Sequence, residues 1–305
     1  MDGQADLDEL ERLRRLAVGV AYRMLGSVAE AEDVAQEALL RLHAAGGRDD
    51  VEVRNPDAFL TTVATRLALD VLRSARVRRE AYVGEWLPEP LVEDFGAQRV
   101  EDDETISLAF VALLERLAPE ERAVYVLREA FDYGFDEIGE VLGKRPDACR
   151  QLLSRARRRV DDERPRFDPD PAQRDALAAR FLLAARDGDL DGLVALLAPD
   201  AVLVGDGGGK ALAISRPLVG AQAVAKALAG FAARGGREGV TFAPARVNGQ
   251  PGVRALAPDG RLVSLLAVDV AGGRVVRVHS LLNPDKLGHL GPLSEMALRR
   301  SPSRG

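Results

Sequence analysis

Apolar residues recur every three or four positions through most of the first 79 residues, in three successive stripes. The first stripe ends near Gly26, the second follows it, and the third runs from Asp57 to about Arg79. This period places apolar side chains on one face of a helix, where they pack against neighbouring helices. The stripes are Leu10, Leu13, Ala17, Val20, Ala21 and Met24; Ala31, Val34, Ala35, Ala38, Leu39 and Leu42; and Phe59, Leu60, Val63, Ala64, Leu67, Val71 and Leu72. The pattern predicts a three-helix domain over residues 1–79, with a charged loop from Gly46 to Pro56.

The helical period is lost between residues 80 and 103, which contain Trp86-Leu87-Pro88-Glu89-Pro90 followed by acidic residues. Proline lacks a backbone donor and disfavours a helix, so this composition predicts a linker. Trp86 is the only tryptophan of the chain. Its large ring either packs locally or docks the linker onto a neighbouring domain, and the sequence leaves both possibilities open.

Four more helices are predicted over residues 104–163, and the last two form a helix-turn-helix over residues 135–160. The first of this pair ends at Leu142, Gly143 supplies the tight turn, and Pro146 suits the first turn of the second helix. A second proline-rich linker, residues 164–171, closes this half of the chain.

The second helix of the pair is apolar on one side and strongly basic on the other. Its predicted buried stripe is Cys149, Leu152, Leu153, Ala156 and Val160. Its outward side chains are Asp147, Arg150, Gln151, Ser154, Arg155 and Arg158. The whole chain has a net charge of −6, so contact with nucleic acid must come from such a local basic face. We expect this helix to lie against a polyanion.

The pattern changes from helical to mixed after residue 171, and residues 172–290 are predicted to form an α+β domain. The predicted helices are Gln173 to Arg186, Leu190 to Leu197 and Ala221 to Ala233. The predicted strands are Ala201 to Gly205, Thr241 to Val247, Gly252 to Ala257, Leu262 to Val270 and Arg274 to Leu282. Turns are placed at Gln250-Pro251-Gly252, Pro258-Asp259-Gly260 and Gly272-Gly273. Residues 291–305 are expected to be a loosely held tail.

Composition excludes several classes of protein. The 305 residues have room for two or three domains. A single cysteine rules out an intrachain disulfide, and with three scattered histidines it gives no zinc-ligand spacing, so no metal or cofactor is expected. No apolar run approaches the roughly 20 residues of a membrane span, and the acidic N-terminus is unlike a signal peptide. We therefore expect a cytoplasmic protein with no membrane partner.

The two helical modules resemble regions 2 and 4 of an extracytoplasmic-function (ECF) sigma factor of RNA polymerase. Residues 29–42 resemble region 2.2 of that family, and residues 152–158 resemble the recognition helix of region 4.2. The second half resembles a SnoaL-like domain of the NTF2-like superfamily, a fusion characteristic of the ECF41 or SigJ-like subgroup. The signatures associated with that subgroup are Trp86-Leu87-Pro88-Glu89-Pro90, Asp206-Gly207-Gly208-Gly209-Lys210 and Asn283-Pro284-Asp285-Lys286-Leu287.

The resemblance implies a multidomain fold: two all-α sigma modules followed by an α+β NTF2-like cone with a curved antiparallel sheet. It also implies a sigma factor, monomeric when free, that binds the clamp and flap of core RNA polymerase and directs it to the −10 and −35 elements of promoter DNA. The C-terminal domain would regulate this activity in place of a separate anti-sigma factor. Two alternatives stay open: a one-component regulator whose C-terminal cavity senses an unknown small ligand, and a SnoaL-type enzyme tethered to DNA.

Site residues follow from the resemblance and from helix geometry. Arg150 and Gln151 are expected to read bases at the −35 element. The full −35 set is Arg145, Asp147, Arg150, Gln151, Ser154, Arg155, Arg158 and Arg159, while Arg157 either joins it or pairs with Asp161 by helical spacing. The −10 candidates are Asn55, Arg73, Arg76, Arg78 and Arg79, with Phe59 as the one aromatic residue nearby. The candidates for binding core polymerase are Asp33, Gln36, Glu37 and Arg41.

The linker and the C-terminal signatures are expected to supply interdomain docking. The docking candidates are Trp86, Leu87, Pro88, Asp206, Lys210, Asn283, Asp285 and Lys286. Arg277 and His279 alternate on one strand face and are the candidates for lining the cavity, with Asp206 as the nearest acid. A single histidine in a strand more often has a structural role than a catalytic one, so no catalytic residue is assigned and the protein is not expected to be an enzyme.

Overall fold

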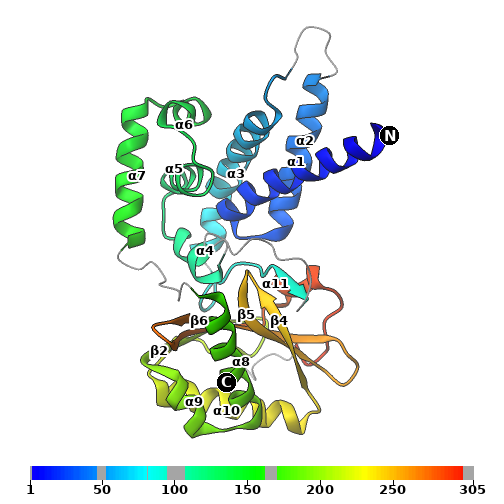
Figure 1. Ribbon diagram of the computed structural model, residues 1–305, viewed down its shortest axis with the longest axis vertical. Coiled ribbons are helices and arrows are strands. Elements are labelled where there is room, and N and C mark those ends of the chain that lie inside the picture. The colour runs from blue at the N-terminus through cyan, green and yellow to red at the C-terminus, as the bar shows by residue number, and fades with distance from the viewer. Residues whose placement is uncertain (1, 47–52, 81, 95–106, 162–169, 298–305) are drawn as a thin grey trace. The chain divides into compact units, whose positions relative to one another are not determined.

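The computed structural model describes residues 2–46, 53–80, 82–94, 107–161 and 170–297, which Figure 1 shows as ribbons. The chain divides into two compact units. The first unit, residues 1–80 with 111–164, is helical, and the second unit, residues 81–110 with 165–305, contains the sheet. The segment that joins the two helical modules along the chain is thus part of the second unit.

The first module of the helical unit consists of α1 (Asp2–Leu25), α2 (Val28–Gly46) and α3 (Pro56–Glu80), which pack against one another pairwise. Gly26 follows α1 with a φ of 63°, a left-handed conformation that allows the sharp turn into α2. The apolar stripes of α1 and α2 are buried from Leu13 to Met24 and from Ala31 to Ala38. The predicted three-helix domain is therefore confirmed.

The buried face of α3 is rotated relative to the predicted stripe. Thr61 and Thr65 are fully buried beside Leu60 and Ala64, whereas Phe59 and the other predicted members Val63, Leu67 and Val71 are only half-buried. The prediction is confirmed for Leu60, Ala64 and Leu72 and was wrong for the other four positions, because it assigned the face by apolar residues alone, and two threonines occupy the interior instead. The ring of Phe59 therefore retains partial access to solvent.

The second module consists of α4 (Leu108–Leu114), α5 (Pro119–Glu129), α6 (Phe135–Leu142) and α7 (Pro146–Asp161). Gly143 ends α6 in the left-handed conformation, with a φ of 64°. Gly139 is required for a different reason, since a Cβ atom there would lie 2.6 Å from the carbonyl oxygen of Lys144. The predicted stripe of α7, from Cys149 to Val160, is buried throughout. The helix-turn-helix is confirmed.

Two arginines join the modules of the helical unit. Arg122 of α5 is 1% exposed, and its guanidinium donates to the Met24 carbonyl at 2.6 Å and to the Glu115 carboxylate at 2.5 Å. Burial lowers the pKa of Arg122 to about 9, so the group still carries its charge at neutral pH. Arg66 of α3 donates to the last carbonyls of α6, including that of Val141 at 2.8 Å. The main-chain acceptors at two helix ends are thus satisfied across the module boundary.

The second unit contains a seven-stranded sheet in the order β1-β4-β5-β6-β7-β2-β3 over the described residues. Its strands are β1 (Val92–Asp94), β2 (Leu197–Asp206), β3 (Leu218–Val219), β4 (Thr241–Val247), β5 (Gln250–Leu256), β6 (Leu262–Ala271) and β7 (Arg274–Leu281). All neighbouring strands are antiparallel except β2 and β7, which are parallel. The predicted α+β architecture is confirmed, with one parallel pair that the meander pattern did not predict.

Helices and loops cover the two faces of this sheet differently. The helices are α8 (Pro171–Asp187), α9 (Leu190–Leu196), α10 (Ala221–Arg237) and the short α11 (Pro284–Leu287), followed by a 3₁₀ turn at Gly288–Leu290. On one face, Phe181, Leu193 and Leu228 from α8, α9 and α10 pack on Val268 and Val278 of the sheet. A second cluster contains Leu87, Leu108, Val204, Leu265, Leu281 and Leu287. Part of the predicted linker is therefore core of this unit.

Three expectations about this unit were wrong. The β4–β5 hairpin turns at Asn248-Gly249, with φ values of 52° and 71°, and not at residues 250–252. This is the Asn-Gly sequence that a type I′ turn favours. The linker forms a strand, β1, which pairs with β4. The first described part of the expected tail is packed, because Leu293 bridges Leu262 and both Ser294 and Ala297 are buried; residues 298–305 lie outside the described structure.

Candidate functional site

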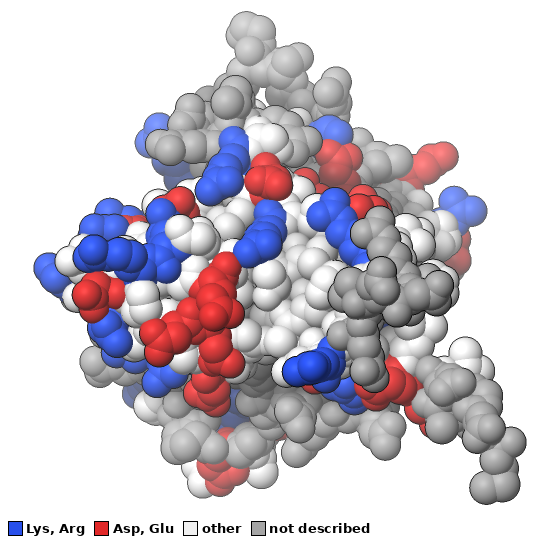
Figure 2. Space-filling model, turned by 90° about the horizontal axis from the view of Figure 1, so that it is seen from above, with Lys and Arg blue, Asp and Glu red and all other residues white. Residues whose placement is uncertain are grey.

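The basic face of α7 is exposed as predicted. Figure 2 shows Lys and Arg side chains gathered on the side of the helical unit where α7 lies, with Asp and Glu side chains beside them. The exposed residues at and after the start of α7 are Arg145, Asp147, Arg150, Gln151, Ser154, Arg155, Arg157, Arg158 and Arg159. Cys149 lies in the opposite, buried stripe, and burial raises the pKa of its thiol.

Arg150 is held at the N-terminal end of α7 by two neighbours. Its guanidinium donates to the Asp147 carboxylate at 2.5 Å and lies 5.2 Å from the centre of the Phe135 ring, which belongs to α6. The side chain nevertheless remains 53% exposed. Arg150 is therefore oriented in advance while its remaining donors face solvent.

Glu121 of α5 positions two other arginines of this face. Its carboxylate is 4% exposed and accepts hydrogen bonds from Arg155 at 3.1 Å and Arg159 at 2.6 Å. The same carboxylate accepts from the backbone of Ala118, so it also caps α5. Both arginines keep about half of their side chains exposed. The sequence pattern gave no indication of Glu121, because its role depends on how α5 packs on α7.

Arg157 and Arg158 differ in their partners. Arg157 pairs with Glu129 of α5 at 2.7 Å, and the side chain of Asp161, the alternative partner by helical spacing, lies outside the described part of the structure. Arg158 makes only a long hydrogen bond, 3.4 Å, to Ser154 of its own helix. Of these two side chains, Arg158 makes the weaker described contact with the rest of the protein.

The candidate polymerase-binding residues share one face of α2. Asp33, Gln36 and Arg41 are exposed, and Glu37 is half-buried and accepts from Arg41 at 2.8 Å. Leu40 lies among them and is 58% exposed. The face therefore combines charge with one exposed leucine, a composition suited to a protein partner.

The candidates for −10 recognition are less clearly grouped on one surface than the candidates on α7 and α2. Asn55 caps α3, accepting from the backbone of Ala58 at 3.1 Å. Arg73 is exposed near Asp70 and Glu120, each 3.5 Å from its guanidinium. Arg76, Arg78 and Arg79 lie on α3, but their side chains are outside the described part of the structure.

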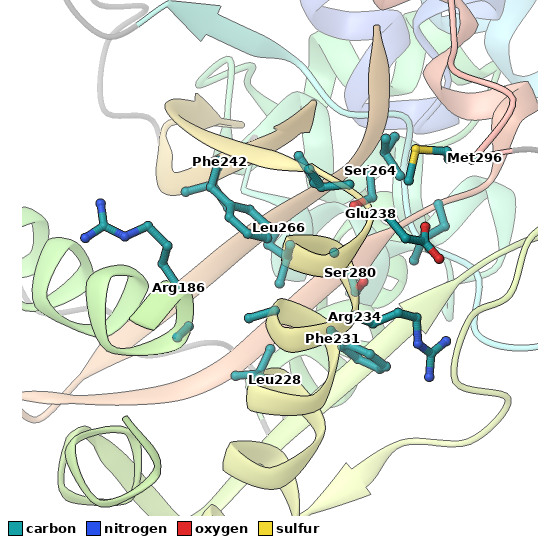
Figure 3. Close-up of a pocket in the computed structure, with 18 of the residues that line it drawn as sticks. Arg186, Leu228, Phe231, Arg234, Glu238, Phe242, Ser264, Leu266, Ser280 and Met296 are labelled. Atoms are coloured by element: carbon teal, nitrogen blue, oxygen red, sulfur yellow. The ribbon is translucent and has the colours of Figure 1, made fainter. Parts of the chain in front are cut away.

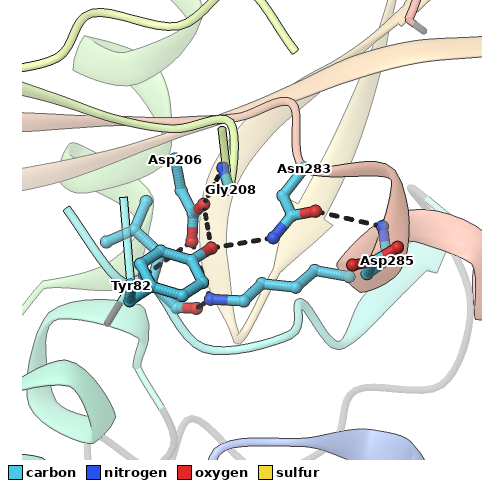
Figure 4. Close-up of polar contacts among 7 residues, drawn as sticks. Tyr82, Asp206, Gly208, Asn283 and Asp285 are labelled. Atoms are coloured by element: carbon cyan, nitrogen blue, oxygen red, sulfur yellow. Dashed lines mark hydrogen bonds and ion pairs between the residues drawn. The ribbon is translucent and has the colours of Figure 1, made fainter. Parts of the chain in front are cut away.

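Asp206 is the centre of a buried polar cluster, which we call the docking cluster (Figure 4). The members labelled in Figure 4 are Tyr82, Asp206, Gly208, Asn283 and Asp285, and the hydrogen bonds add Leu87 and Lys286. The Asp206 carboxylate is 1% exposed and accepts from the Tyr82 hydroxyl at 2.5 Å, the Leu87 backbone at 2.8 Å and the Gly208 backbone at 3.0 Å. A buried carboxylate with this many donors is satisfied only while residues 82–87 stay in place.

Lys286 supplies the positive charge of the docking cluster. Its ammonium group donates to Asp206 at 2.7 Å and to the backbone carbonyl of Leu87. The same group lies 4.2 Å from the centre of the Trp86 ring and 4.8 Å from that of Tyr82. A buried ammonium placed against two aromatic faces and one carboxylate is strongly held. Trp86 therefore contacts the C-terminal signature directly.

The three signatures meet at this point. Gly208 lies against Asn283, since a Cβ atom on Gly208 would come within 2.4 Å of its amide nitrogen. Lys210 forms an exposed ion pair with Asp285 at 2.5 Å. Asn283 also donates to the Tyr82 hydroxyl at 2.7 Å. The glycine run thus permits close approach of a side chain rather than of a phosphate, and all three motifs belong to one structural feature.

The rest of the linker is fastened along the sheet edge. The amide oxygen of Asn248 accepts from the Leu91 backbone at 2.9 Å, and the Leu91 carbonyl accepts from the Asn248 backbone at 2.7 Å. His289 contacts the Pro90 carbonyl at 2.9 Å, and Pro88 and Pro90 are both buried. Sequence reasoning missed Tyr82, Asn248 and His289; only the Asn-Gly turn signal pointed toward one of them.

Docking is expected to weaken at alkaline pH through Tyr82. Burial, and then the charge and hydrogen bond of Asp206, raise the pKa of the Tyr82 phenol above its ordinary value of 10. The docked form therefore keeps the proton while an undocked tyrosine loses it, so docking is at full strength below about pH 10 and declines above it. Fluorescence of Trp86 followed from about pH 9 to pH 11 should show this decline in the wild type.

The Tyr82→Phe variant is the control for this titration. It lacks the ionising phenol, so its Trp86 signal should change less over the same range. Identical titration curves for the two proteins would contradict the role given to Tyr82.

A cavity of about 460 Å³ opens on the helix-covered side of the sheet (Figure 3). Ser280 of β7 lines it, and since neighbouring residues of a strand face opposite sides, His279 points to the other face. The expectation that Arg277 and His279 line the cavity was therefore wrong. His279 is buried and bonded to Asp269 at 2.8 Å, and not to Asp206, which belongs to the docking cluster.

The described residues include neither a cluster of metal ligands nor a membrane-spanning helix. No group of three or more histidine, cysteine, aspartate or glutamate side chains in the described ranges is arranged to hold a metal ion. Among the helices of the described structure, none is long and apolar enough to cross a membrane.

Comparison with known proteins agrees with the two helical modules described above. Residues 10–78 match the Sigma-70 region 2 family and residues 107–160 match Sigma-70, region 4. The ECF RNA polymerase sigma factor SigJ of Mycobacterium tuberculosis is 40% identical over 300 residues, covering 92% of this chain and 93% of SigJ. A probable ECF sigma factor of the same species, SigI, is 33% identical over 282 residues, covering 91% of this chain and 93% of SigI.

A solved structure agrees over nearly the whole chain. The crystal structure of M. tuberculosis SigJ superposes with a TM-score of 0.77 at 37% identity, covering 94% of this chain and all of that one. The similarity thus extends through both sigma modules and the sheet-containing unit. The chain belongs to the extracytoplasmic-function sigma factors of RNA polymerase.

Proposed function

We propose that this sigma factor binds core RNA polymerase through α2, contacts promoter DNA through α7 and the end of α3, and is regulated in cis by its second unit. The observation that carries the regulatory part is the docking cluster. Residues 82–92 connect region 2 to region 4 along the chain, and the second unit holds them by a buried carboxylate, a buried ammonium and a strand pairing.

The exposed face of α2 supports the polymerase contact. Protein interfaces commonly combine a central apolar residue with a polar rim. Leu40 is exposed beside Gln36 and Glu37, one helical turn away, which gives this composition. The clamp of the largest subunit would be the partner of this face, and the flap a partner of region 4.

The geometry of α7 supports contact with the −35 element. Arg150 and Gln151 lie exposed in the first turns of the recognition helix, the end that enters the major groove in helix-turn-helix proteins. Arg155 and Arg159, which Glu121 holds, are placed for phosphate contacts that set the register. The −10 contact would come from Arg73 and the later arginines of α3, with the half-buried Phe59 toward the opposite end of the same helix.

Substitutions on α7 should separate base reading from phosphate binding. Arg150→Ala is expected to relax discrimination at one base pair by about 1–3 kcal/mol, because an arginine pairs bidentately with guanine. Arg158→Ala is expected to weaken binding to all sequences alike and to reduce the salt slope by about 1. Affinity measured on a set of −35 variants at several salt concentrations distinguishes the two effects. Equal effects of both substitutions would contradict the assignment.

Regulation in cis follows from the place of the docked segment in the chain. A sigma factor must set the spacing of its two promoter-reading modules, and the segment between them determines that spacing. When the second unit holds residues 82–92, it shortens the freely moving part of this connection. Release of the segment would therefore change how the modules can be arranged on polymerase.

The cavity residues favour a regulatory role over an enzymatic one. The polar residues among those lining the described cavity are Arg186, Arg234, Glu238, Ser264 and Ser280, and its only acid, Glu238, is exposed. The buried His279–Asp269 pair lies on the other face of the sheet. An acid and base aimed at one substrate are thus not assembled there, and we expect no covalent chemistry.

Run-off transcription with core polymerase tests the proposal. The full-length protein should give promoter-dependent product, and truncation after about Arg164 or near Asn283 should change its amount. A protein that binds DNA specifically but supports no promoter-dependent transcription would contradict the sigma-factor function and favour a one-component regulator. Unchanged activity in both truncated proteins would contradict regulation in cis.

A further inference from the structure

The interior of the cavity in the second unit is apolar except for two hydroxyl groups from the sheet, and its three charged lining residues, Arg186, Arg234 and Glu238, are exposed. Its wall is formed mainly by apolar side chains of α8, α10 and the sheet, among them Phe181, Leu228, Phe242 and Leu266. Its volume of about 460 Å³ lies within the range of sites that hold small molecules. The labelled interior side chains converge on one space in Figure 3.

The two hydroxyls belong to Ser264 of β6 and Ser280 of β7. These residues are 9% and 7% exposed, and both line the cavity. Neither hydroxyl makes a hydrogen bond to another described residue. Ser280 pairs with Leu266, so Ser264 is its diagonal neighbour on the same face, and the two hydroxyls can reach one group between them. Hydroxyls of largely buried residues that face a cavity and bond to no described residue leave a donor and an acceptor for a bound molecule that carries an oxygen.

The charges near the cavity lie at its rim. Arg186 and Arg234 are exposed, and their guanidinium groups extend outward on opposite sides of the view in Figure 3. Arg186 already pairs with Asp187 at 2.8 Å, and Glu238 lies beside Arg234. The interior therefore offers no charge to balance that of an ion, and burial of an unpaired ion is strongly unfavourable.

We propose that this cavity binds a neutral, mainly apolar small molecule with a hydroxyl or carbonyl oxygen between Ser264 and Ser280, and that its occupancy alters the docking cluster. The second part rests on the proposed regulation in cis, whereas the first part does not.

Two short segments couple the cavity to the docking cluster. Residues 206–214 begin with Asp206 and Gly208 of the cluster and end with Leu212, Ala213 and Ile214 of the cavity wall. This loop is tightly folded, because a Cβ atom on Gly207 would lie 2.5 Å from the Ala211 carbonyl. A molecule that displaces the wall therefore pushes on the same loop that presents Asp206.

The end of β7 provides the second segment. Ser280 and Leu282 line the cavity, and the next residue, Asn283, holds Tyr82. The backbones of Leu282 and Asn283 both donate to the Asp206 carbonyl, at 2.8 and 2.9 Å. The two segments are thus joined to each other at the docking cluster, and both change position if the cavity expands.

Binding is tested with the full-length protein and the neutral fluorescent probe N-phenyl-1-naphthylamine, displaced by three matched compounds. We expect 4-cyclohexylphenol to displace the probe at roughly a tenth of the concentration needed for cyclohexylbenzene or 4-cyclohexylbenzoate, since only the phenol is both neutral and able to hydrogen bond. The Ser264→Ala/Ser280→Ala variant should bind the probe and lose this preference. Equal displacement by phenol and hydrocarbon, or preference for the benzoate, would overturn the assigned class.

A filling variant with a matched control shows that the probe occupies this cavity. Ala232 of α10 lines it, whereas the adjacent Ala233 is exposed and does not. Ala232→Phe should abolish probe binding, and Ala233→Phe should leave it unchanged. Probe binding that survives Ala232→Phe would overturn the site.

Coupling is measured through Trp86, the only tryptophan. Excited at a wavelength where the compounds do not absorb, its emission should shift when 4-cyclohexylphenol is added to the wild type and to Ala233→Phe, but not to Ala232→Phe. Binding without a Trp86 response would overturn the coupling. A Trp86 response in a protein whose transcription is insensitive to truncation would support the site and its coupling while the proposed regulation fails.

Discussion

Asp206→Asn is expected to release residues 82–92 from the second unit and to lower the free energy of unfolding by about 3–5 kcal/mol, the usual cost of removing one partner from a buried ion pair. The substitution leaves the Lys286 ammonium, whose side chain is 9% exposed, without its counter-charge. It also replaces one carboxylate oxygen by an amide donor facing the Tyr82 hydroxyl or the Leu87 backbone, both of which donate. Denaturant unfolding followed by Trp86 fluorescence measures the loss.

Asp285→Asn is the matched control for this change. It removes the same charge from the other C-terminal signature, but the Lys210–Asp285 pair is more than half exposed on both sides. Exposed pairs contribute at most about 1 kcal/mol, so this variant should unfold like the wild type. Similar small effects of both substitutions would contradict the central role of Asp206. In run-off transcription, Asp206→Asn should change activity and Asp285→Asn should not.

The local pattern of apolar and turn residues was sufficient to predict most of the fold, because helices and hairpins are specified by residues close together in the sequence. The stripe of α7 and the left-handed Gly143 follow from residues within one or two turns. The rotation of α3 was not predictable in this way. Thr61 and Thr65 have polar side chains, and only the packing of α3 against the other helices decides that they face inward.

The candidate sites were likewise predictable in part, for their residue types but not for their contacts. The residue types of the docking cluster could be chosen from the sequence signatures, whereas their pairing depends on contacts over long sequence separations, such as Tyr82 with Asp206. The prediction that His279 faces the cavity was wrong for a related reason. Alternation determines that His279 and Ser280 face opposite sides, but not which side the helices cover. That choice depends on the packing of α8 and α10.

The sheet gives the second unit two separate functions. Its helix-covered face forms the cavity with Ser280 of β7. The ends of β2 and β7 carry the residues that hold the linker, because Asp206 is the last residue of β2 and Asn283 follows β7. Because β2 and β7 are parallel neighbours, their C-terminal ends lie side by side at the same end of the sheet. The connection that the meander pattern did not predict is thus the one that assembles the docking cluster.

Arg122→Met is expected to lower the free energy of unfolding by about 3–5 kcal/mol, since it removes a buried guanidinium that donates to two acceptors. Arg122 is one of the two arginines that join the modules of the helical unit, and it donates to the Met24 carbonyl at the end of α1 and to the Glu115 carboxylate. Methionine fills a similar volume but donates no hydrogen bond. The Met24 carbonyl in the last turn of α1 then loses this partner, and the Glu115 carboxylate loses its counter-charge. Urea denaturation followed by circular dichroism measures the change.

A double variant separates the charge effect from simple loss of packing. In Arg122→Met/Glu115→Leu the Glu115 carboxylate is also removed, and a buried ion pair replaced by apolar residues often costs little. The double variant should therefore recover more than half of the stability that Arg122→Met loses. The exposed Arg116 offers a surface control, since Arg116→Met should stay within about 0.5 kcal/mol of the wild type. If the double variant is as unstable as Arg122→Met, the lost stability comes from the shape of the arginine side chain and its bond to Met24, and the Glu115 charge plays no part in joining the modules.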